Sequence, residues 1–393
     1  MSSTIPRDLK LQSTNAGTCN APTFYSIYAY QHIPTSTGVL PVTKKSAGKH
    51  YPISFPPPPA KSNRGLRLSE NMANAHLPNS HPQVTPDWKP WPFTQPSFLG
   101  SIETTKLAGF DGNRYSGTVP PAWCASNGRD MAANAGWCLS MLLKTARKYC
   151  RDKYGGNVSS DALTAHIDLL APVPPGLFHV ALQSHDAGSR QKLVKAELIS
   201  PFADKTTVYA AVQIRTGVLE EKIKTESIQP ADRPLPDKTK DCGRLVNSAF
   251  FYYNPPSASM RYYCPNDGES LLWSPKFGGQ SARDQWFKLD DDGLLQLEHI
   301  PLIVDLIPDI PYNHLKGGLA NSKYWLPSLS LNLHFRSNVK GKEWLLTRTD
   351  MRKLHNGRYD LNIQVLDEEG NIVATCVRTS AMIPTRSSKQ SSL

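Results

Sequence analysis

The sequence predicts an α+β protein built from two copies of one unit. Three strand-like segments of the first half recur in the same order in the second half, at offsets of 166, 168 and 165 residues. The pairs are 161–173 with 327–339, 190–198 with 358–366, and 208–213 with 373–378. An apolar helical segment precedes the strands in each half. Shared order and spacing favour a duplication over the chance likeness of two antiparallel meanders.

Residues 1–98 form a Pro/Ser-rich N-terminal extension that differs from the rest of the chain. The run Phe55–Pro59 cannot be a helix or a central strand, because proline fixes φ and lacks an N–H. Aromatic residues are also present, so we expect the extension to be partly ordered. The segment 87–98, with two tryptophans, is the part expected to dock on the folded body.

The first unit is predicted at 99–222 and contains the strongest helix signal. A strand–turn–strand segment with its turn at Asp111–Asn113 comes first. Asn127 or Asp130 then caps a helix whose apolar side chains recur at helical spacing from Met131 to Tyr149. Strand patterns follow at 163–173, 178–184, 191–199 and 206–219.

A charged, proline-containing linker at 223–244 leads to a second unit at 245–386 and a tail at 387–393. Strand patterns precede and follow an apolar helical run that we expect to start at Pro301, since proline suits a first helical turn. The strands are expected at 245–253, 286–289, 328–336, 344–351, 358–367 and 371–382, with a turn at 290–293.

Composition excludes several classes of protein. The net charge is +11, but no run of five basic residues exists, so nucleic-acid binding is not indicated. The charge fits either an ordinary solvated surface or attraction to an anionic, nucleotide-bearing thioester. No segment approaches the ~18 apolar residues of a membrane span. The seven cysteines include no C-x-x-C pair, and the histidines show no metal spacing, so no metal or cofactor is predicted.

Taken in order, five segments resemble the acyl-CoA thioesterase family with a double hotdog fold, of the bacterial thioesterase II type. They are 133–146, 163–176, 298–311, 328–335 and 370–383. The resemblance covers roughly residues 99–385. It implies a tandem hotdog, in which each half is an antiparallel sheet wrapped around a central helix. It also implies hydrolysis of an acyl thioester carried by CoA or by a carrier protein.

The same resemblance implies three catalytic residues, Asp305, Ser328 and Arg378, which position the attacking water. The family has glutamine at the third place, and glutamine both donates and accepts hydrogen bonds, whereas arginine only donates and is always charged. Arg378 therefore pairs with Asp305, binds the developing oxyanion, or marks a site that has lost hydrolysis. The first repeat has Gln213 at the matching place but no aligned acid.

The residues themselves leave alternatives open. Asp305 lies in an apolar segment, where a carboxylate is costly unless it is paired or functional, so it is either a base or half of a structural ion pair. Ser328 follows Pro327 and is either a site residue or an ordinary turn residue. Ser330 and Asn332, at the strand period of two, are expected on its face as substrate-binding residues.

Asn134, Gly136 and Trp137 are the other predicted substrate-binding residues, near the start of the first helix. Backbone N–H groups at a helix start can bind a carbonyl oxygen as its negative charge develops. The alternative is a close packing contact that requires small residues.

Two other functions remain open from the sequence. The first is non-hydrolytic acyl transfer, cyclisation or isomerisation in specialised metabolism, in place of thioester hydrolysis in lipid metabolism. The second is acyl binding without catalysis. A cytoplasmic location is expected, and Ser391–Leu393 is a weak relative of the Ser-Lys-Leu peroxisomal signal. Association into a homo-oligomer is also open.

Overall fold

The computed structural model describes most of the chain between residues 96 and 384, all within the compact unit 64–393. The described ranges are 96–110, 112–126, 131–155, 160–188, 190–202, 207–219, 233–245, 254–265, 280–315 and 324–384. Several predictions lie outside them: the extension up to residue 95, Asp111, the caps Asn127 and Asp130, the strand 246–253 and the tail 387–393.

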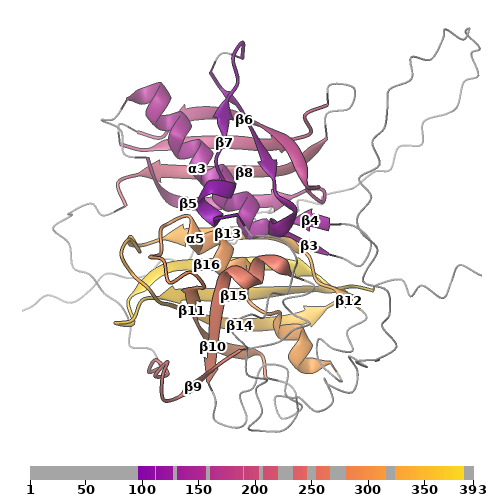
Figure 1. Cartoon of the computed structure of the whole chain (residues 1–393), viewed down its shortest axis with the longest axis vertical. Helices are drawn as coiled ribbons and strands as arrows, with labels where there is room; N and C mark the ends of the chain where they lie inside the picture. Colours follow the sequence, from indigo (N-terminus) through magenta and orange to yellow (C-terminus); the bar gives the residue numbers. More distant parts are fainter. Residues whose placement is uncertain are drawn as a thin grey trace, which may run out of the picture. The chain divides into compact units, whose positions relative to one another are not determined.

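One antiparallel sheet of 13 strands runs through the described residues (Figure 1). Its order in the first half is β1 (Thr105–Lys106), β2 (Arg114–Val119), β6 (Gly176–Asp186), β7 (Lys192–Ile199), β8 (Val208–Gly217) and β5 (Asp161–Leu169). It continues through β13 (Ser328–Phe335), β16 (Ile372–Ala381), β15 (Arg358–Leu366), β14 (Leu345–His355), β11 (Ala282–Leu289), β10 (Met260–Pro265) and β9 (Cys242–Arg244). The pairing of β5 with β13 joins the two halves into one sheet.

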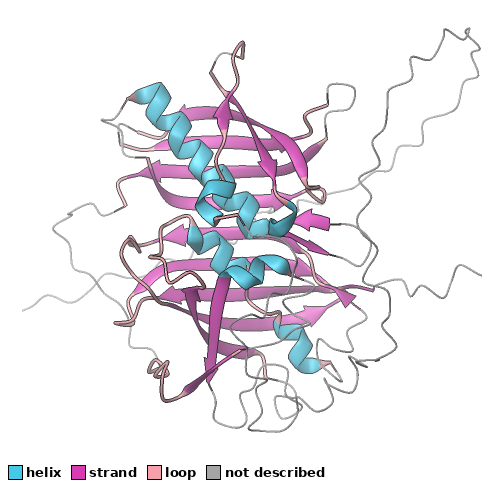
Figure 2. Cartoon of the chain, in the orientation of Figure 1, coloured by secondary structure: helices cyan, strands magenta, loops and turns pink. Residues whose placement is uncertain are grey.

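Each half wraps its strands around a helix, and both helices lie on the same face of the sheet (Figure 2). The long helix α3 (Ala135–Tyr154) packs on β5–β8, and the short helix α5 (His299–Asp305) packs on β15 and β16. The smaller elements are α2 (Phe98–Ser101), η1 (Pro121–Trp123), β3 (Cys124–Ser126), β4 (Met131–Ala133), η2 (Pro255–Ser259), η4 (Ile310–His314), β12 (Tyr324–Trp325) and β17 (Ile383–Pro384). This is the predicted α+β architecture.

The helix α3 starts later than the apolar spacing predicts. Met131 lies in β4, which pairs with β3, and the helix begins at Ala135. The reason is Asn134, whose side-chain oxygen accepts a hydrogen bond from the N–H of Trp137 at 3.2 Å. That bond satisfies one of the unpaired donors of the first turn, which is what a helix cap does. The second helix starts at His299, two residues before the predicted start at Pro301, and Pro301 lies within its first turn.

The duplication extends to an irregularity of the sheet. The register of β5 shifts between Ala162 and Thr164, and that of β13 shifts between Ser328 and Ser330, which confirms the offset of 166. Ala162 pairs with Thr216, whereas Ser328 pairs with Ser380. The last strands therefore correspond at an offset of 164 rather than 165.

This one-residue difference corrects the placement of Gln213. Because side chains alternate between faces, a shift of one residue moves a side chain to the other side of the sheet. Gln213 is exposed opposite His166 on the outer face, and the counterpart of Arg378 is Ile214. By the same register, Val194 corresponds to Leu361 at an offset of 167 rather than 168.

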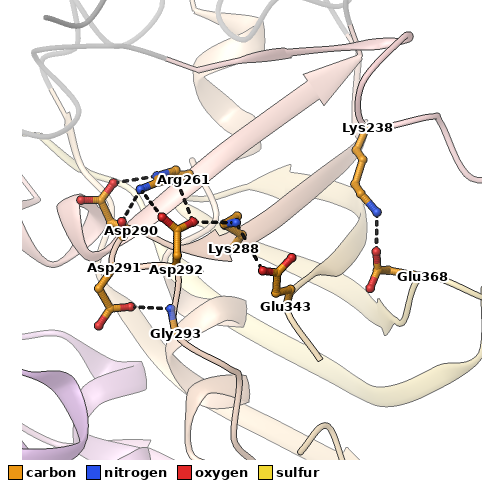
Figure 3. Close-up of polar contacts among 9 residues, drawn as sticks. All are labelled: Lys238, Arg261, Lys288, Asp290, Asp291, Asp292, Gly293, Glu343 and Glu368. Carbon is orange, nitrogen blue, oxygen red and sulfur yellow. Dashed lines mark hydrogen bonds and ion pairs between the residues drawn. The ribbon is translucent and has the colours of Figure 1, made fainter. Parts of the chain in front are cut away.

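The described part of the predicted linker packs on the outer face of the second half. Leu235 contacts a small apolar cluster formed by Trp286, Leu346 and Leu366. The indole N–H of Trp286 donates to the carbonyl oxygen of Pro236 at 2.9 Å, and Lys238 pairs with Glu368 (Figure 3). These bonds fix the course of this segment across the sheet.

The acidic turn after β11 is neutralised by basic neighbours (Figure 3). Arg261 lies 3.1 Å from Asp290 and 2.9 Å from Asp292, and Lys288 lies 2.6 Å from Asp292. Among the described residues no group of three or more His, Cys, Asp or Glu side chains is arranged to hold a metal ion.

No helix in the described part of the chain is long and apolar enough to cross a membrane.

The two helices approach each other at backbone distance through Gly136. A Cβ atom at this position would lie 2.3 Å from the carbonyl oxygen of Pro301 and 2.8 Å from the Cα of Leu302. Four residues on, Ser140 donates a hydrogen bond to the carbonyl oxygen of Glu298 at 2.7 Å. Only glycine fits at residue 136 without displacing the main chain of α5.

We therefore expect Gly136→Ala to lower the free energy of unfolding by about 2 kcal/mol or more, because the obstructing atoms are backbone that cannot rotate away. Urea denaturation measures this change. Gly100→Ala is the matched control, since its Cβ would meet only the hydroxyl of Ser97. Equal losses for the two variants would contradict the close helix contact.

Candidate active site

A cavity of about 400 Å³ lies where the start of α3, the end of α5 and the start of β13 meet. Most of its lining is apolar and comes from β3–β4, the segment after β5 and the segment before β13. These residues are Ala125, Ala132, Ala133, Ala135, Leu169, Leu170, Ala171, Pro172, Val173, Trp325, Leu326, Pro327, Leu329 and Ile383. The polar lining residues are Asn134, Asn254, Asp305, Asp309, Tyr312, Ser328 and Arg378. The cavity thus combines an apolar volume with a group of charged side chains.

Asp305 is the point where three elements meet. Its Oδ1 accepts a hydrogen bond from the hydroxyl of Ser328 at 2.6 Å, and its Oδ2 accepts from the backbone N–H of Gly136 at 2.9 Å. The residue is only 8% exposed. Two donors aimed at its oxygens offset part of the cost of removing a carboxylate from water. The structure therefore brings Asp305 and Ser328 together at the cavity wall.

Arg378 lies beside this carboxylate but bonds mainly to other groups. It is 2% exposed, and its Nη1 donates to the main-chain oxygen of Asp305 at 2.9 Å while lying 3.8 Å from Oδ1. Its Nη2 pairs with Asp309, which also accepts a hydrogen bond from the hydroxyl of Tyr359 at 2.7 Å. The expected pairing with Asp305 exists, but the closer carboxylate is that of Asp309.

The pKa values of this pair follow from burial and charge. Burial alone would lower the pKa of Arg378, but the charges of Asp309, Tyr359 and Asp305 hold it above its ordinary value. Burial raises the pKa of Asp309, and the charge of Arg378 opposes that rise. Each group therefore depends on the other to remain charged in the interior.

A second buried arginine supports the segment that carries Asp309. Arg283, on β11, donates to the carbonyl oxygen of Pro308 at 2.5 Å and to the side chain of Asn313 at 3.0 Å. Burial lowers its pKa to about 10. Its two bonds fix the chain on either side of Asp309.

Sequence reasoning missed both Asp309 and Arg283. Asp309 lies between Pro308 and Ile310, in a segment that reads as a turn after the helix. One signal was present in the sequence: Asp309 is a second acid, four residues after Asp305, in an otherwise apolar stretch. Arg283 gave no signal, because nothing in its strand marks it as buried.

The helix start supplies fewer free donors than the sequence suggests. The N–H of Gly136 is bonded to Asp305, and the N–H of Trp137 is bonded to the side chain of Asn134. The remaining amide of the first turn belongs to Ala135, for which the described residues provide no acceptor. Ala135 and Asn134 both line the cavity.

Trp137 lies in the core rather than at the cavity. Its side chain is fully buried, its indole N–H donates to Ser101 at 2.9 Å, and its ring meets that of Phe178 edge to face. The large aromatic side chain therefore packs α3 against the first half of the sheet.

The prediction that Ser330 and Asn332 share the face of Ser328 is wrong. The bulge between Ser328 and Ser330 inserts one extra residue, so Leu331 and Leu333 take the inward positions. Asn332 is exposed on the outer face, and neither it nor Ser330 lines the cavity.

The first half does not repeat this site. The counterparts of Ser328 and Arg378 are Ala162 and Ile214, neither of which can hold a charge or donate a hydrogen bond from its side chain. Asp305 lies at the C-terminal end of α5. At the opposite, N-terminal end of this helix, Arg147 of α3 forms an ion pair with Glu298. The duplicated fold therefore carries one acidic site and one ion-paired contact.

Comparison with protein-family models and solved structures agrees with this architecture. Residues 231–382 match the family model of the acyl-CoA thioesterase C-terminal domain. The second half of the chain is therefore similar to the acyl-CoA thioesterase family. No curated protein sequence matches the chain.

Among solved structures, the chain is similar to a candidate thioesterase II from Thermobifida fusca, with 17% identity, a TM-score of 0.56, and coverage of 72% of this chain and 97% of that one. It is also similar to a protein of unknown function with a hot dog fold from Alicyclobacillus acidocaldarius, at 15% identity, a TM-score of 0.57, and 75% and 100% coverage. A third similar structure is a candidate thioesterase from Novosphingobium aromaticivorans, with 13% identity, a TM-score of 0.53, and coverage of 72% of this chain and 99% of that one. At these identities the likeness shows the fold, and it confirms the predicted tandem hotdog.

The bulge predicts a difference between two serines on one strand. Ser328→Ala removes the hydroxyl that donates to Asp305, and we expect a loss of about 1.5–3 kcal/mol in the free energy of unfolding. Ser330→Ala, on the other side of the bulge, is the control and should stay within about 0.5 kcal/mol. Urea denaturation of both variants measures this. A loss at Ser330 equal to that at Ser328 would contradict the assigned faces.

Proposed function

We propose that this protein hydrolyses an acyl thioester in the cavity at the end of α5. The observation that carries the proposal is the carboxylate of Asp305, held by Ser328 and the Gly136 amide at the wall of a largely apolar cavity. The match of the second half to a thioesterase family supports the same conclusion.

In the proposed reaction, Ser328 and Asp305 orient one water molecule. The hydroxyl hydrogen of Ser328 is donated to Asp305, so the serine oxygen can only accept a hydrogen bond from the water. The water therefore points a lone pair away from the protein and toward the thioester carbonyl. Asp305 takes its proton as the oxygen–carbon bond forms.

The resulting tetrahedral intermediate carries a negative charge on its oxygen. The N–H of Ala135, at the positive end of the 20-residue helix α3, is the donor placed to stabilise it. The carbon–sulfur bond then breaks, and the thiolate takes the proton held by Asp305. The products are a free acid and a free thiol, and no cofactor is required.

Arg378 contributes charge to this reaction rather than a contact with the water. Its Nη hydrogens already point at the Asp305 carbonyl and at Asp309, and a guanidinium has no acceptor. The positive charge lies 3.8 Å from Oδ1 of Asp305 and favours negative charge in the cavity. The family glutamine, which could accept from water, has no equivalent here.

The substrate we propose is an acyl group on CoA or on a carrier protein, with its chain against the apolar lining. Cytoplasmic or peroxisomal location, membership of lipid or specialised metabolism, and assembly into a homo-oligomer stay predictions. The C-terminal signal at Ser391–Leu393 lies outside the described residues.

A second candidate function follows from Arg378. A cation where the family has a water-binding glutamine favours chemistry without water, such as acyl transfer, cyclisation or isomerisation of a bound acyl compound. Binding of an acyl ligand without turnover is the third candidate. Thiol release separates all three, because only hydrolysis produces free acid and thiol in equal amounts.

We expect the protein to release free thiol from at least one member of a panel of short-, medium- and long-chain acyl-CoAs. Asp305→Asn should lower kcat by about 100- to 10,000-fold, because it removes the proton acceptor while keeping the shape of the side chain. Asp360→Asn, an exposed acid on β15 whose partner is Thr379, is the matched control and should keep the native rate.

Full thiol release by Asp305→Asn would end the proposed mechanism. Release of thiol without free acid would support acyl transfer. A bound acyl-CoA that stays intact with every variant would support the binding function.

A further inference from the structure

Two carboxylates share one guanidinium beside the cavity. Arg378 lies between Asp305 and Asp309, both of which line the cavity, and it bonds to the main chain of the first and the side chain of the second. Asp309 is not part of the predicted catalytic set, and its position four residues beyond Asp305 places it past the end of α5.

We propose that Asp309 is a positioning residue that holds the guanidinium of Arg378 away from the carboxylate of Asp305, so that Asp309 and Arg378 function as one ion-paired unit. The consequence for activity rests on the proposed function, whereas the consequence for geometry and stability does not. In this arrangement Asp305 keeps an oxygen available to the cavity.

The charge of Arg378 requires a partner in the interior of the protein. An arginine remains protonated in proteins, and this one is 2% exposed, so it requires a counter-charge within the interior. Among the described residues, two carboxylates line the cavity, those of Asp305 and Asp309. The counter-charge therefore comes either from Asp309 or from the proposed base.

The guanidinium of Arg378 also lies close to the carboxylate of Asp305. Nη1 of Arg378 lies 3.8 Å from Oδ1 of Asp305, beyond hydrogen-bond distance but close enough for a small rotation to close the gap. Oδ1 is the oxygen that already accepts from Ser328. A direct bond from Arg378 would occupy the side of Oδ1 that the water needs. Pairing of Nη2 with Asp309 holds the guanidinium in its present position.

Hydrogen bonds from two strands hold Asp309 and its segment in place. Tyr359 donates its hydroxyl to Asp309 at 2.7 Å, and Arg283 bonds to the chain at Pro308 and at Asn313. Strands β15 and β11 therefore both hold the segment that carries Asp309. This degree of bracing is what a group that positions another group requires.

The direct test is the crystal structure of Asp309→Asn, with wild type and Asp360→Asn as references. We expect the guanidinium of Arg378 to move until Nη1 donates to Oδ1 of Asp305, shortening the present 3.8 Å to hydrogen-bond distance. A guanidinium that stays in place in Asp309→Asn would overturn the proposal. This readout does not depend on any activity.

A double-mutant cycle tests whether the two residues form one unit. Asp309→Asn leaves the buried Arg378 without its main partner, Arg378→Gln does the same to the half-buried Asp309, and each variant should have a Tm several degrees lower. The double variant Asp309→Asn/Arg378→Gln removes both charges and should melt above either single variant. Losses that simply add in the double variant would contradict the unit. If Asp309→Asn does not fold, folding of the double variant supports the proposal and its failure to fold contradicts it.

The pH dependence of Arg378→Gln separates a charge effect from a packing effect. The groups that face Asp309 are Arg378, Tyr359, Asp305 and Arg283. Burial already raises the pKa of Asp309, and loss of Arg378 should raise it further. A folded-state pKa above the unfolded value means that stability is present at low pH and is lost as pH rises through the folded pKa. The decrease in Tm of Arg378→Gln relative to wild type should therefore be larger at pH 8 than at pH 5. An equal decrease at both pH values would contradict a charge effect.

The activity arm uses thiol release from the acyl-CoA panel. Asp309→Asn should lower kcat at least about tenfold, although Asp305 and Ser328 are unchanged, and the double variant should regain rate. Loss of rate without recovery would overturn the positioning role. If wild type itself releases no thiol, the proposed function fails, while the crystal structure and the Tm cycle still decide the position of Arg378.

Discussion

The close contact between the two central helices at Gly136 is the constraint on which the rest of the site depends. Without a side chain at this position, the main chain of α3 comes within contact distance of Pro301 and Leu302. Only at that distance can the N–H of Gly136 reach the carboxylate of Asp305. The same contact sets Asp305 against Ser328 on β13 and leaves Ala135 at the cavity wall. The sequence leaves two roles open for Gly136, a close packing contact and a part of the substrate-binding helix start. In the structure one contact between the helices meets the packing requirement and also sets the geometry of the proposed chemistry.

The buried and half-buried charges beside the cavity form a balanced set. Asp305 and Asp309 lie with Arg378 and Arg283, and every one of these side chains bonds to the main chain or to another member of the group. A buried charge without a partner is costly, so an arginine at residue 378 has consequences for its neighbours. The first half, with Ala162 and Ile214 at the matching positions, needs no such compensation. The two copies of the unit have therefore kept the same strands and the same bulge, while in the described part of the chain buried carboxylates occur only in the second copy.

The duplicated α+β fold could be predicted because apolar periodicity and the order of strands repeat along the chain. Asp305 stood out because an acid in an apolar helix is unusual, whereas Ser328 was indicated only by the resemblance to a family. Three features could not be found in this way. The bulge after Ser328 has no sequence signature, yet it moves Ser330 and Asn332 to the outer face. The register of β16 against β13 shows that Ile214, and not Gln213, corresponds to Arg378. Sequence similarity between the two halves is too weak to reveal this shift of one residue. The pairing of Arg378 with Asp309 depends on the path of the chain after α5, which two prolines make irregular.

In the proposed mechanism the thioester carbonyl lies between Asp305 and the amide of Ala135, and one measurement tests this directly. It is the crystal structure of the wild-type protein with an acyl-CoA analogue in which a methylene group replaces the thioester sulfur, so that the carbonyl remains but cannot be hydrolysed. We predict that the ketone oxygen accepts a hydrogen bond from the N–H of Ala135, and that a water molecule lies between Asp305, Ser328 and the carbonyl carbon. An analogue bound with its carbonyl outside this cavity, or bound here with the carbonyl turned away from Asp305, would contradict it.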